Sequence, residues 1–192
     1  MHQTARRHVR RAPLWVALCI APALHGCASA PPQPVLEQLD ERTGVTINRL
    51  ARPLELVAAS VRSAGADPFA ALAPFETNVM GRRTRWLWIA FPGDAESPSP
   101  PHRVIVDGTP LSLPAAGADP GSVSLKEFPY APAAPWNAVR IFALDATATA
   151  RLASAREVGI TVEYPEGRVT FSATVGAPSP LAEFAARTLE PR

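Results

Sequence analysis

Histidine and cysteine are scarce in this sequence, whose 192 residues include four histidines and two cysteines. Three of the histidines and one cysteine fall within the first 26 residues, which leaves His102 and Cys27 in the rest of the chain. A disulfide needs two cysteines, zinc sites gather several His and Cys ligands, and nucleophilic catalysis needs a base beside the nucleophile. The sequence therefore predicts none of these features after residue 26. His102 is interpreted as a solvated residue at the start of a strand.

Other chemistries lack their sequence signatures. No Gly-x-Ser-x-Gly elbow and no phosphate-binding glycine loop occurs. Asp94 and Glu96 lie close together but do not have the spacing of a calcium loop. Of the acids that could act as a pair on a glycan, Asp107 is explained by a turn and Asp145 by a helix cap, while Glu76 lies near the end of an element. We predict no catalytic residue, no metal and no cofactor, and keep a cell-wall glycan hydrolase as a less favoured alternative.

Long apolar runs are also missing. The run at residues 13–24 follows a basic head with four arginines and no acid. It is about half the ~20 residues that a membrane-spanning helix needs. A basic head, a short apolar middle and a small residue before the cleavage site are the parts of a secretory signal. We therefore predict a signal peptide at residues 1–26.

The end of this segment, Leu24-His25-Gly26-Cys27, resembles the lipobox of bacterial lipoproteins, with His25 as the departure from the pattern. The resemblance implies cleavage between Gly26 and Cys27 and attachment of lipid, including a fatty acid such as palmitate, at Cys27. The next residue is Ala28 and not Asp, which by the same resemblance favours the periplasmic side of the outer membrane. The alternative is an ordinary secretory signal cut after Ala28 or Ala30.

Removal of the signal peptide changes the charge of the chain. Four arginines leave with it, so residues 27–192 carry 15 basic and 17 acidic residues, and the net charge moves from +2 to −2. A chain without a basic balance gives no support for a nucleic-acid partner. The partners that we expect are the membrane, through the lipid anchor, and an envelope protein.

Two strand-forming stretches, residues 43–50 and 54–61, open the predicted domain. Asp67-Pro68 has the signature of a helix start, so we expect a short helix to Leu72 that ends before Pro74. The apolar run in residues 83–91 predicts a central strand that is covered on both faces. The Pro-, Ser- and Gly-rich residues 92–101 predict a surface loop.

Hairpin and helix signals fill the second half of the chain. Asp107-Gly108 predicts a two-residue turn between strands at residues 102–106 and 109–113, and Pro110 places the second strand at a sheet edge. Residues 114–135 predict an irregular crossing with a short strand at 122–128, followed by a strand at 139–144 and a helix that is capped by Asp145 and runs to 156. Alternating apolar residues predict a hairpin at 158–164 and 169–175 with one buried and one solvent-exposed face. The last predicted element is a helix that begins at Ser179-Pro180.

One cluster of cationic and aromatic residues is a candidate interaction surface: Arg82, Arg83, Arg85, Trp86 and Trp88. Such a surface can bind an anionic glycan, a lipid headgroup or a protein. The alternative is a solvated turn that leads into a core strand, with the arginines packed near the tryptophans.

These elements predict a mainly β domain, either β-sandwich-like or compact α+β, with antiparallel sheets, a short internal helix and a C-terminal helix. The expected organisation is a signal peptide at 1–26, a lipidated cysteine and proline-rich tether at 27–38, and a single globular domain at 39–192. Ten such tether residues extend about 30 Å.

Several short motifs resemble a group of uncharacterised proteobacterial lipoproteins over residues 39–113. They are Leu39-Asp40, Thr43-Gly44-Val45-Thr46, Pro53-Leu54, Pro74-Phe75-Glu76-Thr77-Asn78, Gly81-Arg82, Leu87-Trp88 and Asp107-Gly108. The resemblance implies a lipoprotein and supplies no catalytic residue. We expect a non-enzymatic envelope lipoprotein that binds a partner protein or envelope component. The alternative is a subunit of a secretion or envelope-spanning assembly, since residues 139–144 are similar to a strand of the small type VI secretion lipoprotein.

Overall fold

The computed structural model describes residues 34–58, 69–93, 102–132, 138–165 and 167–189. They belong to one compact unit, Gln33–Arg192, and the remaining unit is Met1–Pro32. The described elements are β1 (Val35–Asp40), β2 (Val45–Leu50), β3 (Leu54–Ala58), β4 (Phe69–Val79), β5 (Arg82–Phe91), β6 (His102–Val106), β7 (Thr109–Leu111), β8 (Ala115–Gly117), the 3-10 turn η1 (Pro120–Val123), β9 (Ala138–Leu144), α1 (Ala146–Ala153), β10 (Glu157–Tyr164), β11 (Gly167–Thr174) and α2 (Pro180–Leu189).

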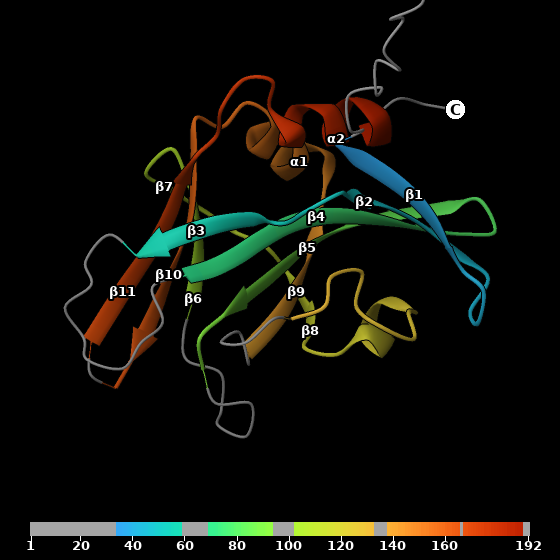
Figure 1. Ribbon diagram of the computed structural model, residues 1–192, viewed down its shortest axis with the longest axis horizontal. Coiled ribbons are helices and arrows are strands. Elements are labelled where there is room, and N and C mark those ends of the chain that lie inside the picture. Colours follow the sequence, from blue (N-terminus) through green and yellow to red (C-terminus); the bar gives the residue numbers. More distant parts are fainter. Residues whose placement is uncertain (1–33, 59–68, 94–101, 133–137, 166, 190–192) are drawn as a thin grey trace, which may run out of the picture. The chain divides into compact units, whose positions relative to one another are not determined.

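The eleven described strands form one antiparallel sheet in the order β7-β6-β10-β11-β3-β4-β5-β9-β8, with β2 also paired to β4 and β1 paired to β2. Figure 1 shows this sheet curled, with α1 and α2 together over one part of it. The prediction of a mainly β domain with antiparallel pairing, an internal helix and a C-terminal helix is confirmed. The strands belong to one curled sheet and not to two packed sheets.

The predicted helix from Asp67-Pro68 to Leu72 is wrong, because β4 runs from Phe69 to Val79 straight through Pro74. Proline lacks a donor and is normally excluded from a central strand. In β4 it lies at a gap in the neighbouring edge, since residues 69–72 pair with β3 and residues 75–78 pair with β2. No ladder bond is lost there, and the Pro74 carbonyl accepts a hydrogen bond from the Tyr130 hydroxyl at 3.2 Å.

Strand β5 lies between β4 and β9, which confirms the predicted central position of residues 83–91. Its two faces are both covered. Cross-strand register puts Arg85, Leu87 and Ile89 on the face that meets the helices, and Trp86 and Trp88 on the other face, where Tyr130 packs. The residues from Leu87 to Phe91 are all fully buried as a result.

Both predicted hairpins and both helix caps occur. Asp107-Gly108 joins β6 to β7, β7 is an edge strand, and β10 pairs with β11. The Asp145 carboxylate accepts from Ala148 N at 2.6 Å and the Ser179 hydroxyl from Ala182 N at 3.2 Å. The face of β10 predicted to be wet is partly buried, because Thr161 is 7% exposed and bonds Thr170 across the hairpin.

Other boundaries differ from the predictions. The first strand begins at Val35, whereas the domain was predicted to begin at residue 39 and its first strand at residue 43, so the end of the predicted tether is already part of the sheet. The predicted strand at 122–128 is wrong, because η1 ends at Val123 and residues 124–128 belong to no helix or strand; the short strand of this crossing is β8, at Ala115–Gly117. Residues 59–61 of one predicted strand and 94–101 of the predicted loop lie outside the described residues, as do Asp94 and Glu96.

Asp107 gives the fold a pH dependence. Hydrogen bonds from the backbone N–H groups of Glu157 and Arg156, both 2.9 Å long, hold the pKa of the Asp107 carboxyl below 3.8. A folded-state pKa below the unfolded value means that the charge stabilises the fold above about pH 3.8 and that this stabilisation is lost as the pH falls further.

We therefore expect the variant Asp107→Asn, whose amide keeps the turn geometry, to be less stable than wild type near neutral pH and to approach it in acid. Urea unfolding of both proteins at about pH 7 and about pH 2.5 measures this difference. A stability gap that is equally large at both pH values would contradict the role of the carboxylate charge.

Candidate functional site

The five residues of the candidate interaction surface do not share one surface. Arg82 is exposed at the turn between β4 and β5, whereas Arg83, Arg85 and Trp86 are half-buried and Trp88 is 0% exposed. Their side chains alternate between the two faces of β5, as expected for a strand. The arginines at 83 and 85 therefore act on one side of the sheet and the tryptophans on the other.

Arg83 pairs with a buried carboxylate. Glu76 is 0% exposed, and its Oε1 accepts from Arg83 Nε at 3.0 Å and from Asn48 Nδ2 at 3.1 Å. Arg83 Nη2 lies 3.0 Å from the same oxygen. Arg85 is the direct cross-strand neighbour of Glu76 and places a second positive charge on the same face. The lone acid of the central strand is thus balanced by the two arginines beside it.

The same arginines hold the end of the C-terminal helix. Arg83 Nη2 donates to the Arg187 carbonyl at 3.3 Å, and Arg85 Nη1 donates to the Thr188 carbonyl at 3.0 Å. The last carbonyls of a helix lack intrahelical partners and carry partial negative charge, so cations stabilise them. Arg83 and Arg85 therefore bind α2 within the molecule.

The tryptophans are fixed on the opposite face. Trp86 Nε1 donates to Thr77 Oγ1 at 2.9 Å, and the Trp88 ring lies 5.2 Å from the ring of Tyr130. The guanidinium of Arg49 lies 5.5 Å from the centre of the same tyrosine ring. Burial raises the pKa of the Tyr130 phenol, so this hydroxyl stays a hydrogen-bond donor. Trp88 is a core residue that packs on Tyr130, and the half-buried Trp86 packs against the same core.

The tip of the β4–β5 hairpin is the part of this region that faces solvent. Val79 pairs with Arg82, which leaves Met80 and Gly81 as the two central residues, and their φ values of 50° and 88° are those of a type I′ turn. The Met80 side chain is 101% exposed and Val79 is 39% exposed. Asn78 Oδ1 accepts from Gly81 N at 2.9 Å and fixes the turn.

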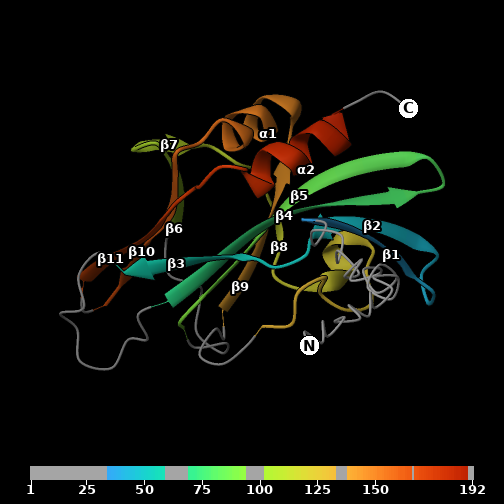
Figure 2. The same ribbon diagram turned by 45° about the horizontal axis from the view of Figure 1, so that its top comes forward.

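This tip departs from the usual chemistry of its turn. Type I′ turns favour Asn-Gly and Asp-Gly because both positions need positive φ. The β6–β7 hairpin follows the rule with Asp107-Gly108, at φ values of 49° and 74°. Met80 takes the first position of its turn although a left-handed conformation costs such a residue about 1–2 kcal/mol, and it presents an apolar side chain to water. Figure 2 shows this tip at the same end of the domain as the turn between β1 and β2.

Sequence reasoning missed this tip. The Met80-Gly81 pair stands between two β-forming runs, which is the signal for a hairpin turn. The signal was hidden because the run before it was assigned to a helix that ended at Pro74. Gly26 and Cys27, the predicted cleavage and lipid-attachment residues, lie outside the described residues.

His102 occupies a different environment from the predicted solvated one. Its ring is half-buried and lies between two phenylalanines, with centroid distances of 5.6 Å to Phe91 and 5.4 Å to Phe142. These rings come from β5 and β9, which lie near the β8 end of the strand order, so His102 on β6 brings the β7 end of the curled sheet against its β8 end. No cluster of three or more His, Cys, Asp or Glu side chains suited to a metal ion occurs among the described residues.

Comparison with known proteins finds no matching family model, no matching curated protein and no matching solved structure. Within the described ranges, none of the helices has both the length and the apolar character to cross a membrane.

Replacement of Glu76 tests the buried cluster. We expect Glu76→Gln to lower the free energy of unfolding by about 3 kcal/mol, the lower end of the range for breaking a buried pair, since the Arg83 side chain stays 24% exposed. Chemical denaturation measures the change.

The matched control is Glu37→Gln, which removes the partner of Arg187 at 3.5 Å in a pair whose side chains are 32% and 48% exposed. A surface pair contributes about 0–1 kcal/mol, so the control is expected to stay close to wild type. Equal losses in the two variants would show that burial of Glu76 does not set the strength of its pair.

Proposed function

We propose that this chain is a non-enzymatic lipoprotein of the bacterial outer membrane, anchored at Cys27 on the periplasmic side, that binds a partner protein of the envelope through the tip of the β4–β5 hairpin. The observation that carries the binding role is Met80, a fully exposed apolar residue in a left-handed conformation. Residues that violate local preferences in this way cluster at functional sites, and an apolar side chain beside Arg82 suits an interface.

The anchor rests on the sequence pattern Leu24-His25-Gly26-Cys27. The first strand begins at Val35, so residues 27–34 are the chain available as a tether. Eight residues with three prolines reach about 25 Å in an extended conformation. A tether of this length keeps the domain close to the membrane and leaves the hairpin tip available to a neighbouring protein.

The roles of the candidate acids support a binding protein over a glycan hydrolase. Glu76 is engaged by Arg83 and Asn48 and is fully buried. The carboxylate of Asp107 accepts two backbone hydrogen bonds, and that of Asp145 caps α1. Each acid singled out for a hydrolase therefore has a structural partner. A subunit of a secretion or envelope-spanning assembly is a form of the same proposal, in which the partner is a permanent neighbour.

The anchor has a direct test. Cells fed an alkyne fatty acid are expected to label the wild-type protein and to leave Cys27→Ala unlabelled, as detected on a gel after coupling to a dye. The variant is also expected in the soluble fraction, because each buried methylene of an acyl chain contributes roughly 0.8 kcal/mol to membrane binding. An unlabelled wild type would refute the lipoprotein assignment and leave the ordinary secretory signal.

The hairpin tip is tested by Met80→Asn, which creates the preferred Asn-Gly turn. We expect the variant to be more stable by about 1 kcal/mol, because asparagine adopts the left-handed conformation more readily. In crosslinking pull-downs of the lipidated protein from envelopes, we expect recovery of its partner to fall roughly tenfold, as for an interface residue worth about 1.4 kcal/mol.

Val57→Thr is the matched control, because Val57 is 49% exposed and apolar but lies on β3, away from the tip. It should recover the partner as wild type does. If Met80→Asn also recovers the partner fully, the tip is not the contact. If Val57→Thr loses it equally, binding depends on general surface hydrophobicity and not on the hairpin.

A further inference from the structure

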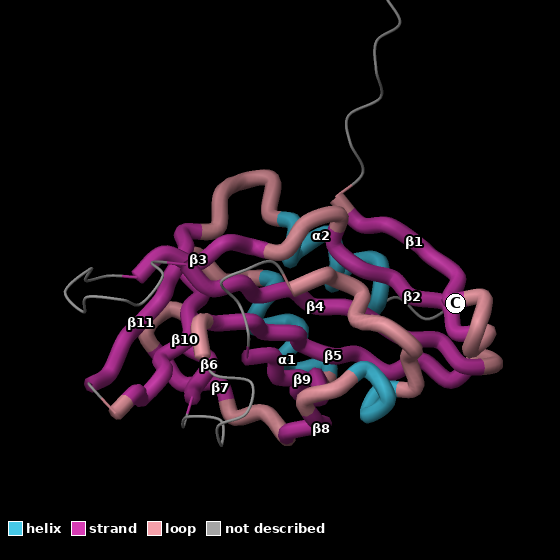
Figure 3. Tube along the Cα trace, turned by 60° about the horizontal axis from the view of Figure 1, so that its bottom comes forward, coloured by secondary structure: helices cyan, strands magenta, loops and turns pink. Residues whose placement is uncertain are grey.

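A cavity of about 350 Å³ lies where the curled sheet leaves a gap between the β6–β7 hairpin and β9. Of the described residues, eight line it: His102, Arg103, Val104, Pro110, Leu111, Ser112, Leu113 and Phe142. Figure 3 shows the segment after β7 crossing from that hairpin towards β8, which pairs with β9. The cavity therefore lies at the seam between two parts of the sheet and is open to solvent on one side.

The cavity has an apolar floor. Val104, Leu111 and Phe142 are 3%, 8% and 8% exposed, so part of the cavity wall is made of core residues. Val104 and Leu111 face each other across the β6–β7 pair. Ligand sites in proteins combine such an apolar lining with a few polar groups that fix orientation. Here the polar groups at the wall are His102, Arg103 and Ser112.

Among the described residues that line the cavity, the side chains that can carry a charge are all basic. None of the eight lining residues is acidic. Arg140 adds a further cation, because it lies on the same face of β9 as Phe142, two residues along the strand, and opposite Ile89. Its side chain is half-buried, burial lowers the pKa of its guanidinium, and among the described residues no carboxylate pairs with it.

An uncompensated cation is costly in a partly buried position. An anion bound beside the cation would offset the free-energy cost of burying its charge, whereas a neutral ligand would not. At about 30 Å³ for each water-sized group, the cavity has room for roughly ten such groups. This volume is at the lower end of the ~300–1,000 Å³ typical of ligand pockets, which favours a small molecule over a lipid with two chains.

We propose that the seam cavity binds a medium-chain carboxylate, with its apolar chain against Leu111, Leu113 and Phe142 and its carboxylate towards Arg140 and His102. This site is separate from the hairpin tip and does not depend on the anchor at Cys27. It gives a role to the position of His102 between two aromatic rings at this seam. It also assigns a role to an arginine that has no acidic partner in the described part of the chain.

The test uses the full chain in isolated envelopes and a decanoate that carries a small diazirine in its chain. After irradiation, we expect mass spectrometry to find the probe on the peptides that contain residues 109–113 and Phe142. Unlabelled decanoate should compete for the label, and decanol, which has the same chain without the charge, should compete at least tenfold more weakly.

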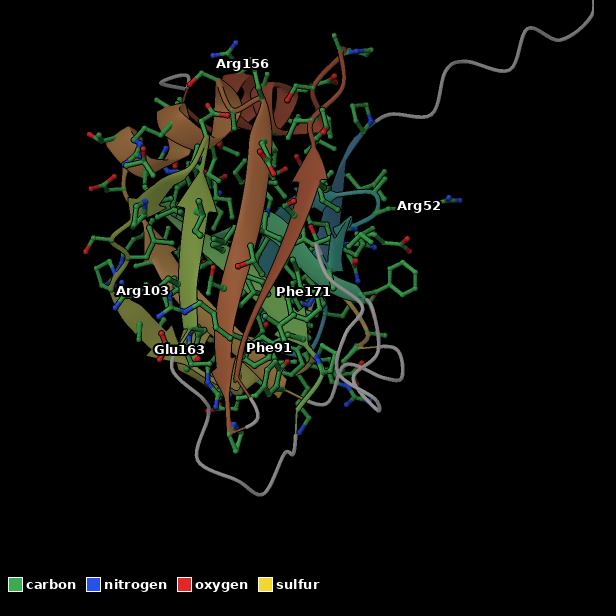
Figure 4. All side chains as sticks on the ribbon, turned by 90° about the vertical axis from the view of Figure 1, so that its left-hand side faces the viewer. Arg52, Phe91, Arg103, Arg156, Glu163 and Phe171 are labelled. Atoms are coloured by element: carbon green, nitrogen blue, oxygen red, sulfur yellow. The ribbon has the colours of Figure 1, made fainter. Side chains whose placement is uncertain are left out.

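Two variants and one control separate the parts of the proposal. Leu113→Trp fills the half-buried edge of the cavity and should abolish labelling, while Arg140→Gln should reduce labelling about tenfold. Arg52→Gln should label as wild type, because Arg52 is exposed and lies on the opposite side of the domain from Arg103, as Figure 4 shows. Circular dichroism of each purified variant establishes that it is folded.

Labelling that survives Leu113→Trp would overturn the site. Equal competition by decanol, or equal labelling of wild type and Arg140→Gln, would overturn its preference for an anion. None of these outcomes depends on whether the hairpin tip binds a protein, so this proposal and the proposed function can fail independently.

Discussion

The structure depends on how the buried carboxylate of Glu76 is neutralised. This acid lies in the central strand β4 at 0% exposure, where an unpaired charge would be prohibitive. Arg83 supplies the countercharge, and its Nη2 also donates to the Arg187 carbonyl in the last turn of α2. One side chain thus pairs with Oε1 of the buried Glu76 and with a carbonyl at the end of the C-terminal helix, while Glu76 Oε2 is left without a hydrogen-bond partner among the described residues. The position of the helix follows from the chemistry of the sheet.

The consequences extend to the first strand. Arg187 of α2 donates to the Val35 carbonyl at 3.2 Å and pairs with Glu37, so the helix held by β5 in turn holds β1. The beginning and the end of the described domain are therefore joined beside the Glu76 cluster. Residues 104 positions apart in sequence, Arg83 and Arg187, meet there. This long-range closure explains why α2 packs on β1, β2 and β4 although it follows β11 in the chain.

The long β4–β5 pairing stabilises the unusual hairpin tip. The β4–β5 ladder continues without a break from Ala71 and Ala90 to Val79 and Arg82, and it is the longest pairing in the sheet. This pairing sets the two-residue loop, so Met80 must take a left-handed conformation. The free-energy cost of this conformation is confined to the turn, and the pairing of β4 with β5 on either side offsets it. In contrast, the seam beside His102 lies between the two ends of the strand order, and a cavity occurs there because none of the described strands fills the gap.

Much of the local structure could be predicted from sequence, because the signals for it are local. Asp107-Gly108 marks its hairpin, Asp145 caps its helix, and the apolar run ending at Phe91 marks a covered strand. Asp67-Pro68 is an equally good local signal, and it failed because residues 69–79 gain strand partners on both edges. Pairing of that kind joins residues that are distant in sequence, so no window around Pro74 contains the information.

The candidate site shows the same division. The sequence alone determined the low supply of histidine and cysteine and the cluster of arginines before the tryptophans. Only the tertiary structure decided what that cluster does, because β-strand alternation sends Arg83 and Arg85 to α2 and Trp88 into the core. It also decided that Met80, and not the arginines beside it, is presented to solvent. The sequence determines which charged and polar side chains need a hydrogen-bond or ion-pair partner. Folding determines which partner groups lie close enough to contact them, because those groups come from distant parts of the chain.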